Sequence, residues 1–422
     1  MKRMLLLAGL AAIAFTGPAL ADTNLKLVEV ITSPQRTEFL KGQIDKFEAA
    51  NPGIKVEIVS LPWGEAFEKF LTMVQAGETP DIAEMPERWM SLYANNGQLE
   101  NLDPYIAKWD EAPTLGERAV QFSKTVKDTA YMVPYGFYLR GLYWNKKLFK
   151  EAGITAPPKT LDEFMDVSKK IGALGGGKAG YCLRGGKGGT GGTAFFMLTM
   201  DGKGKFFNDD GTSTLGDADA AKGMQFLVDL YKAGGAPKDS LNWGFNETVT
   251  GFYSGACAML DNDPDAMIGI LDHMKPEDFA VAPMPVGPGG HAYPSIGYAG
   301  WSMFANSEHK EESWKLMSYL LDSAQNKEWA KFVGVLPIHK GAEQDEHFAG
   351  ERYAGWFKEL NDPQWQPIPW PAHLEEFGYF FDVMSVQSFQ EALLGQKSTA
   401  DVAKDWADYL TAAQQKFLAG KK

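Results

Sequence analysis

The chain has 422 residues, of which 45 % are hydrophobic and 23 % are charged, and its formal net charge is −13. This composition supports a packed core and excludes a disordered chain. The acidic balance disfavours nucleic acid and anionic lipid as partners, and the length predicts two or more domains.

The first 21 residues have the layout of a secretory signal peptide. A basic start, an apolar run from Met4 to Phe15 and an A-x-A cleavage site ending at Ala21 follow one another. The alternative, a membrane anchor, is disfavoured because the apolar run is short for a bilayer span. We therefore expect a mature chain that begins near Asp22 and lies in the periplasm of a Gram-negative bacterium. Loss of the two basic residues would change its net charge to −15.

The next segment predicts alternating strands and helices. Apolar strands are expected at residues 25–31, 54–58 and 81–83. Helices separate them, one beginning after Ser33 as its N-cap and one covering residues 67–77. This order is typical of a parallel sheet with crossover helices.

The middle of the chain contains an aromatic stretch and a glycine-dense stretch. YGFYLRGLYW at residues 135–144 is half aromatic, and a helix is expected directly after it, at 146–152. Thr160 and Glu163 predict a capped helix start. Residues 172–193 are rich in glycine but lack the G-x-x-x-x-G-K-[ST] pattern. They predict flexible loops around a strand rather than a phosphate site.

The second half of the chain continues the mixed pattern. We expect a helix at 220–234, a helix, turn and buried strand over 247–260, strands at 278–282 and 297–304, and two helices within 313–334. Two more helical stretches are expected near the C-terminus. Cys182 and Cys257 each lie in a strand-like context, which fits either one disulfide or two buried thiols.

The sequence indicates no catalytic, cofactor or metal site. Neither G-x-S-x-G nor H-E-x-x-H occurs, and the six histidines are scattered. Aromatic residues instead follow strands or lie in loops, among them Trp63, Trp301 and Trp370. In open α/β sheets ligands bind beyond the carboxyl ends of the strands. Rings mixed there with acids and amides suit a sugar, whose C–H faces are apolar and whose edges carry hydroxyls.

Six segments in order resemble the extracellular solute-binding proteins of ABC sugar importers, in the family 1 group that includes maltose- and trehalose-binding proteins. They are FEAANPGIKVEI (47–58), QAGETPDIAEM (75–85), GQLENLDPYI (97–106), VPYGFYLRGLYWNKKLFKEAGI (133–154), FYSGACAML (252–260) and SEHKEESWKLMSYL (307–320). The resemblance implies an α/β fold of two lobes, the type II periplasmic binding protein fold. Each lobe would be a mainly parallel sheet flanked by helices, with the cleft at the hinge crossovers.

The resemblance also implies where the lobes and crossovers lie. The N-terminal lobe would comprise residues 22–134 and 302–340, and the C-terminal lobe residues 138–295 and 350–422. The chain would cross between them near residues 134–144, 294–302 and 336–349.

Ligand contacts are implied at loops that match those of the family. They are Ser33, Gln35, Arg36, Trp63, Glu65, Glu84, Arg88, Tyr135, Tyr138, Arg140, Asn262, Asp263, Gly300, Trp301, Gln366 and Trp370. Trp301 is expected to stack on the ligand, and Arg36, Glu84 and Asp263 to hold its hydroxyls. Tyr138 stands where relatives often have an acid, so the identity of the sugar stays open.

The function implied is capture of a mono- or oligosaccharide by a monomeric binding protein, without catalysis, and its delivery to the membrane subunits of an ABC permease. One alternative keeps the fold but changes the ligand to a polyol or an anionic sugar derivative, because Arg36, Arg88, Arg140 and Arg184 are available. A second alternative is a secreted carbohydrate-active enzyme, which would share the aromatic cleft but need a pair of acids.

Overall fold

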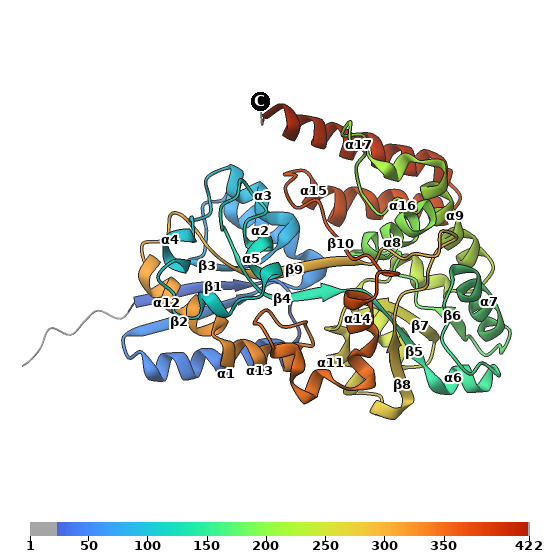
Figure 1. The fold of residues 1–422 in the computed structure, drawn as a ribbon, viewed down its shortest axis with the longest axis horizontal. Coiled ribbons are helices and arrows are strands. Elements are labelled where there is room, and N and C mark those ends of the chain that lie inside the picture. Colours follow the sequence, from blue (N-terminus) through green and yellow to red (C-terminus); the bar gives the residue numbers. More distant parts are fainter. Residues whose placement is uncertain (1–22, 421–422) are drawn as a thin grey trace, which may run out of the picture.

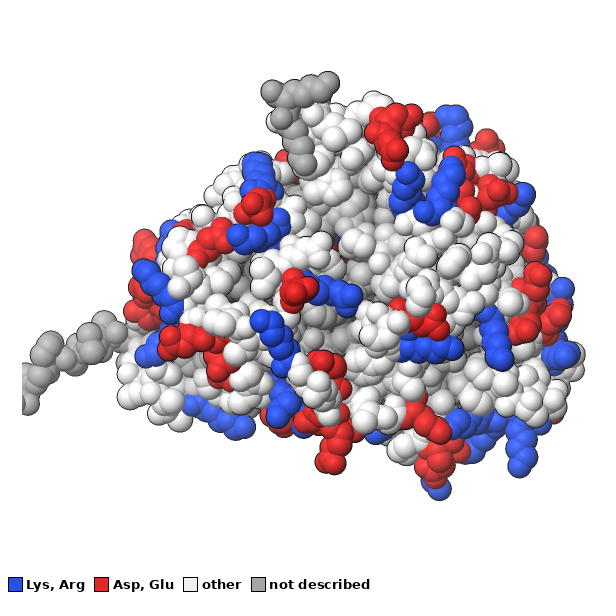
Figure 2. All heavy atoms as spheres, viewed as in Figure 1, with Lys and Arg blue, Asp and Glu red and all other residues white. Residues whose placement is uncertain are grey.

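The computed structural model describes residues 23–420, which form two β-sheets with helices packed on their faces (Figure 1). The signal peptide expected at residues 1–21 lies outside the described residues. Within the described part, no helix is both long and apolar enough for a membrane span. Figure 2 shows acidic and basic side chains interspersed over the face in view.

The first sheet contains the three strands expected at the start of the chain. β1 (Thr23–Glu29) pairs in parallel with β2 (Ile54–Ser60) and with β3 (Ile82–Pro86). The connecting helices are α1 (Pro34–Ala50) and α2 (Trp63–Gln75), and α3 (Glu87–Asn95) follows β3. The hydroxyl of Ser33 accepts a hydrogen bond from the N–H of Arg36, which confirms the expected N-cap of α1.

Both sheets are mixed: parallel pairs predominate in the first sheet, as expected, and antiparallel pairs in the second. In the first sheet β9 (Ser295–Met303) runs antiparallel to β3 and to β4 (Val133–Leu139), and β10 (Ile368–Pro369) pairs in parallel with β9. In the second sheet β5 (Gly141–Asn145) is antiparallel to β7 (Cys257–Asn262) and to β8 (Phe279–Ala282). Only β6 (Ala179–Tyr181) pairs there in parallel, with β7. β9 runs antiparallel to β3 and β4, and the order of helices and strands in the sequence does not show this direction.

Helices cover both sheets. The first sheet is covered by α1, α2 and α3 and by two later helices, α12 (Lys310–Leu321) and α13 (Ser323–Val333) (Figure 1). Around the second sheet lie α6 (Lys146–Glu151), α7 (Leu161–Gly172), α9 (Ala218–Lys232), α10 (Phe245–Tyr253), α11 (Ala266–Leu271) and α14 (Glu351–Asn361). Thr160 caps α7 by accepting from the N–H of Glu163, as expected. Short helices α4 (Asp103–Ile106) and α5 (Glu117–Ser123) lie on the first lobe.

The aromatic stretch at 135–144 carries the chain from one sheet to the other. Its first part is β4 of the first sheet and its last part is β5 of the second, with Arg140 between them. Opposite β9 the register shifts between Pro134 and Gly136, so Tyr135 is the extra residue of a bulge. Tyr135 and Tyr143 are fully buried, and aromatic side chains therefore supply the core on both sides of the crossing.

Two parts of the chain are more helical than expected. The end of the glycine-dense stretch is not a loop, because residues 190–193 form the buried first turn of α8 (Thr190–Asp201). The C-terminal part contains α15 (Phe377–Tyr379), a π-helical turn (Phe380–Met384), α16 (Ser385–Leu393) and α17 (Thr399–Gly420), besides α14. Trp406 of α17 is fully buried, which explains how this long helix is held.

Cys182 and Cys257 form a disulfide, which resolves the two possibilities that the sequence left open. The bond joins the start of β7 to the residue after β6, across 75 positions of sequence. The disulfide thus anchors the N-terminal end of the segment that carries Arg184 and the start of α8.

We expect loss of this disulfide to lower the free energy of unfolding by about 2 to 4 kcal/mol, because the open chain gains conformational entropy when unfolded. Urea unfolding of the oxidised protein, with and without reductant, measures the effect. The paired variant Cys182→Ser/Cys257→Ser should match the reduced protein and should not respond to reductant. Two free thiols in the unfolded, unreduced protein would contradict the bond.

Candidate functional site

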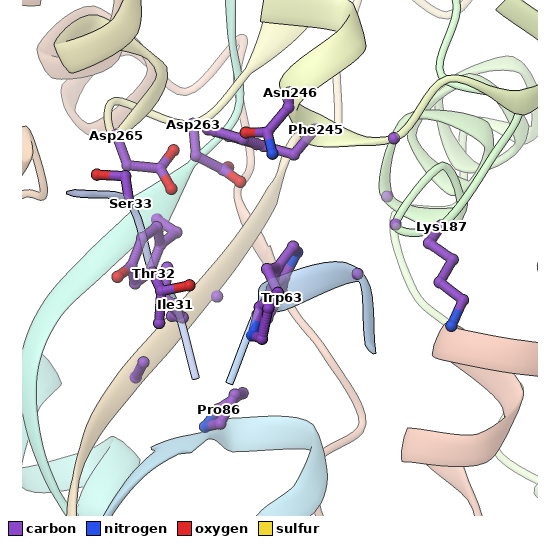
Figure 3. A pocket seen from close by; sticks show the side chains of 18 of the residues that line it. Ile31, Thr32, Ser33, Trp63, Pro86, Lys187, Phe245, Asn246, Asp263 and Asp265 are labelled. Carbon is purple, nitrogen blue, oxygen red and sulfur yellow. The ribbon is translucent and has the colours of Figure 1, made fainter. Parts of the chain in front are cut away.

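A cavity of about 910 Å³ lies between the two lobes. From the first lobe it is lined by the residues that follow β1, β2 and β3, including Ser33, Trp63 and Arg88. The carboxyl ends of parallel strands meet there, as in other open α/β sheets that bind ligands. From the other side come Arg184, Lys187, Gly188, Gly191, residues 244–247, Asp263 and Asp265. Figure 3 shows the two aspartates on the opposite side of the cavity from Pro86, with Trp63 between.

Half of the residues expected to contact a ligand line this cavity. They are Ser33, Trp63, Glu65, Arg88, Tyr138, Arg140, Asp263 and Trp370. The others lie outside its lining: Gln35, Arg36, Glu84, Tyr135, Asn262, Gly300, Trp301 and Gln366. The cavity also has lining residues that the expectation did not include, among them Glu87, Arg184, Phe245, Asp265, Tyr298 and Phe381.

Arg36 and Glu84 form a buried ion pair, and neither residue is part of the cavity lining. Arg36 Nη2 lies 2.5 Å from Glu84 Oε1 and donates to the Tyr135 hydroxyl at 2.8 Å. The other carboxylate oxygen of Glu84 accepts from the N–H groups of Val30 and Ile31, both at 2.7 Å. These bonds hold the end of β1 in place just where it enters the cavity.

Hydrogen bonds through Tyr135 and Tyr138 connect the Arg36–Glu84 ion pair to the cavity. The hydroxyls of Tyr135 and Tyr138 are 2.9 Å apart, and Tyr138 is the one that lines the cavity. The bulge at Tyr135 turns its ring toward Arg36, so the aromatic stretch serves both the core and the site.

Trp301 does not contribute ring surface to the cavity. It is 2 % exposed, and its ring packs on that of Tyr135 with the centroids 5.6 Å apart. Ser295, Gly297 and Ala299 of the same strand line the cavity, but Trp301 lies further along β9, opposite Glu84 of β3. The prediction therefore placed the site on the correct strand, but Trp301 lies on β9 beyond the residues that line the cavity.

Other aromatic residues line the cavity from both lobes. Trp63 of the first lobe is partly exposed and stacks on Trp89, with a centroid distance of 6.0 Å. Phe245 begins α10 of the second lobe, and Trp370 is 9 % exposed. Phe245 follows Trp243 and Gly244 in the motif NWGF, and this aromatic pair at a glycine was the signal that could have identified it.

The remaining expected residues have structural partners. Gln35 donates to Asp272 of the second lobe at 2.7 Å, Asn262 accepts from the N–H of Asp263, and Gln366 donates to the carbonyl of Pro363. A side chain at Gly300 would collide with the carbonyl of Val133, since a Cβ there would lie 2.1 Å from that oxygen. Gly300 is therefore required by strand packing.

Buried charges surround the cavity. Arg88 pairs with Asp382 of the π-helical turn, with 3.0 Å between Nε and Oδ2, and its guanidinium also lies over Trp63. Arg140 pairs with Asp261 of β7, again with 3.0 Å between Nε and Oδ2. Each pair joins segments that are far apart in the sequence, and both arginines line the cavity.

Burial raises the pKa of Asp263, and two other carboxyl groups of the lining, Asp265 and Glu87, have pKa values raised to about 7. Burial raises the pKa of Asp265 to about 7, and the neighbouring charge of Asp263 adds to the shift. Burial also raises the pKa of Glu87 to about 7, although the charge of Arg88 opposes it. Near neutral pH Asp265 and Glu87 are therefore each divided between a carboxylate, which accepts hydrogen bonds, and a carboxylic acid, which also donates. The lining thus offers donors and acceptors beside aromatic faces, as ligand hydroxyls require.

The sequence model of the bacterial extracellular solute-binding proteins matches residues 33–327, more than half of the chain. The chain belongs to this family. This solute-binding protein is 28 % identical over 407 residues to a putative binding protein of Brucella abortus, with 95 % of this chain and 96 % of the relative covered. It is 24 % identical over 395 residues to the mannitol-binding protein of Pseudomonas aeruginosa, with 88 % of each chain covered.

A solved structure supports the same conclusion. T. maritima MalE3 with maltose bound superimposes on this solute-binding protein with a TM-score of 0.80 and 25 % identity, covering 92 % of this chain and 99 % of that one. The expected family and the two-lobed α/β fold are thereby confirmed. Family members of this kind are binding proteins that act outside the bacterial cytoplasm.

Removal of Glu84 should strongly destabilise this solute-binding protein, because Arg36 would keep a buried charge without its partner. We expect Glu84→Ala to lower the free energy of unfolding by about 3 to 5 kcal/mol in urea titrations. Asp45→Ala removes an exposed carboxylate that lies 2.7 Å from Lys41. This control should cost less than about 1 kcal/mol. Equal losses of unfolding free energy in the two variants would contradict the claim that the buried Arg36–Glu84 pair stabilises the protein more than a surface pair does.

Proposed function

We propose that the protein captures a sugar or polyol between its lobes in the periplasm and delivers it, unchanged, to the membrane subunits of an ABC importer. The observation that carries the proposal is the interlobe cavity, which has aromatic rings from both lobes and buried polar groups around them. A monomer would suffice, because the described cavity is built from one chain.

The lining suits a hydroxyl-rich ligand. Trp63 and Phe245 lie on opposite lobes, and flat rings of this kind pack against the C–H faces of a sugar. Asp263 and Asp265 point into the cavity (Figure 3), where they can accept hydrogen bonds from ligand hydroxyls. A mannitol-binding relative, a maltotriose-binding relative from Pyrococcus abyssi and the maltose-bound T. maritima structure agree with this ligand class.

Ligand-driven closure of the lobes gives a mechanism for capture. A ligand that touches both lobes binds the closed state better than the open one, and this difference shifts the population toward closure. Direct contacts between the lobes exist as well: Lys187 pairs with Glu68 at 2.8 Å, and Gln35 bonds Asp272 at 2.7 Å. Both contacts are on the surface, so each is weak and reversible.

A thermal-shift screen of sugars and polyols tests the proposal. A ligand that binds only the folded protein should raise the melting temperature in a concentration-dependent way. The ligand should be recovered with its mass unchanged after incubation. Release of new reducing ends from a glycan panel would favour the carbohydrate-active enzyme, and the absence of any shift would contradict binding of this ligand class.

The ring of Trp63 should carry a substantial part of the affinity. We expect Trp63→Ala to weaken binding of a ligand found in the screen by about 2 kcal/mol, which is roughly thirtyfold in Kd. Trp109→Ala is the matched control, because Trp109 is similarly half-buried, packs on Trp314 and lies outside the cavity lining. Titration calorimetry of both variants gives the comparison. An unchanged Kd for Trp63→Ala would remove this ring from the site.

A further inference from the structure

Helix α8 starts at the cavity with a first turn that no side chain caps. Gly189 is its N-cap, Thr190, Gly191 and Gly192 follow, and Gly191 lines the cavity. The first N–H groups of a helix have no acceptor within the helix, and the helix dipole makes this end partially positive. Thr190 fixes the turn in place, because its hydroxyl donates to the carbonyl of Phe381 at 2.8 Å.

The two glycines allow charged groups to approach this turn. A Cβ at Gly191 would lie 3.1 Å from Cζ of Arg140, and one at Gly192 would lie 2.9 Å from Oδ2 of Asp261. The guanidinium of Arg140 is therefore packed directly on the start of α8. A side chain at either position would force Arg140 and its partner Asp261 away from the helix end.

Two buried arginines at this place each have a terminal nitrogen without a hydrogen-bond partner among the described residues. Arg140 is 3 % exposed; its Nε donates to Asp261, but its Nη2 is unsatisfied. Arg184 is 9 % exposed; its Nε donates to the carbonyl of Lys187 at 2.8 Å, and its Nη2 is also unsatisfied. Both side chains line the cavity.

Arg184 differs from the other arginines of the cavity because no described carboxylate lies within 4 Å of its guanidinium. Its guanidinium lies 5.7 Å from the ring centroid of Phe245. Lys187, on the same segment, extends away from Asp263 and Asp265 in Figure 3 and pairs with Glu68. Asp263 and Asp265 attract Arg184 electrostatically but form no direct ion pair with it. A buried guanidinium without a direct ion pair is costly, and an anion from outside the chain would satisfy its unpaired nitrogen.

We propose that the start of α8 with Arg140 and Arg184 binds the acidic group of the ligand, so that the captured solute is a sugar or polyol bearing one carboxylate or sulfonate. This inference rests on the proposed function and specifies its substrate class. Free helix N–H groups and guanidinium forks are the donors that such anions bind best. Asp263 and Asp265 line the same cavity and can accept hydrogen bonds from the neutral hydroxyls. Their negative charge, partial in the case of Asp265, opposes a doubly charged phosphate more strongly than a single charge.

Matched pairs of probes test the charge requirement. Titration calorimetry would compare galacturonate with galactose, glucuronate with glucose and gluconate with sorbitol; glucose 6-phosphate provides the dianion and a sulfonated sugar the second monoanion. At least one monoanion should bind about tenfold or more tightly than its neutral counterpart. Raising NaCl from about 0.05 M to about 0.5 M should weaken binding of the anion by several-fold and leave neutral ligands unaffected.

Variants then test the residue. Arg184→Gln should weaken binding of the preferred anion by about ten- to hundredfold and leave neutral ligands within about twofold. Arg184→Lys should retain part of the affinity. Arg118→Gln, which removes the same charge from an exposed position on α5, should bind as the wild type does. Melting temperatures establish that each variant is folded, and if Arg184→Gln is not, Arg184→Lys and the salt series decide.

The outcomes separate this inference from the function on which it rests. If neutral sugars or polyols bind as tightly as their acids, or if Arg184→Gln leaves the preference for the acid intact, the anion site is overturned and sugar capture stands. Tighter binding of the sugar phosphate would overturn the restriction to a single charge. If no probe of any class binds, both proposals fall together.

Discussion

The site depends on a simple constraint: a buried guanidinium needs a partner, and here the partner comes from a distant segment. Arg36 pairs with Glu84, Arg88 with Asp382 and Arg140 with Asp261. Because breaking such a pair is far more costly than losing a surface pair, each holds its two segments in one relative position. The pairs Arg36–Glu84 and Arg140–Asp261 therefore fix the walls of the cavity within each lobe, whereas Arg88–Asp382 joins α3 of the first lobe to the C-terminal segment. The surface pairs between the lobes can open.

The strands that cross between the lobes also carry residues that line the cavity. Arg140 is the residue between β4 and β5, so the position where the chain changes sheet also carries a lining side chain. Ser295, at the start of β9, accepts a hydrogen bond from the N–H of Arg140 through its carbonyl and lines the cavity too. Any change in the angle between the lobes must therefore alter the surroundings of these two residues, which couples ligand contact to closure.

Much of the architecture follows from local patterns in the sequence. The alternation after residue 54 predicts β2, and Ser33 and Thr160 predict helix starts, because these signals depend only on neighbouring residues. The antiparallel entry of β9 and the return of the C-terminal segment to Arg88 depend on contacts between distant residues, which no local pattern records. Trp301 is a second example. Its strand was predicted to line the site and does so, but Trp301 itself packs against β3 and β4, which are distant in the sequence.

The glycine-dense segment was predicted to form loops around a strand, but its last residues form the start of α8. Glycine lowers helix stability by about 1 kcal/mol relative to alanine, so Gly191 and Gly192 argue against a helix on propensity alone. The helix nevertheless begins there, because Thr190 anchors it and because α8 is buried along its length. A larger residue would gain helix propensity but collide with Arg140 or Asp261. Space for a charged pair thus outweighs propensity, and this is the type of conflict expected at a functional site rather than in an ordinary core.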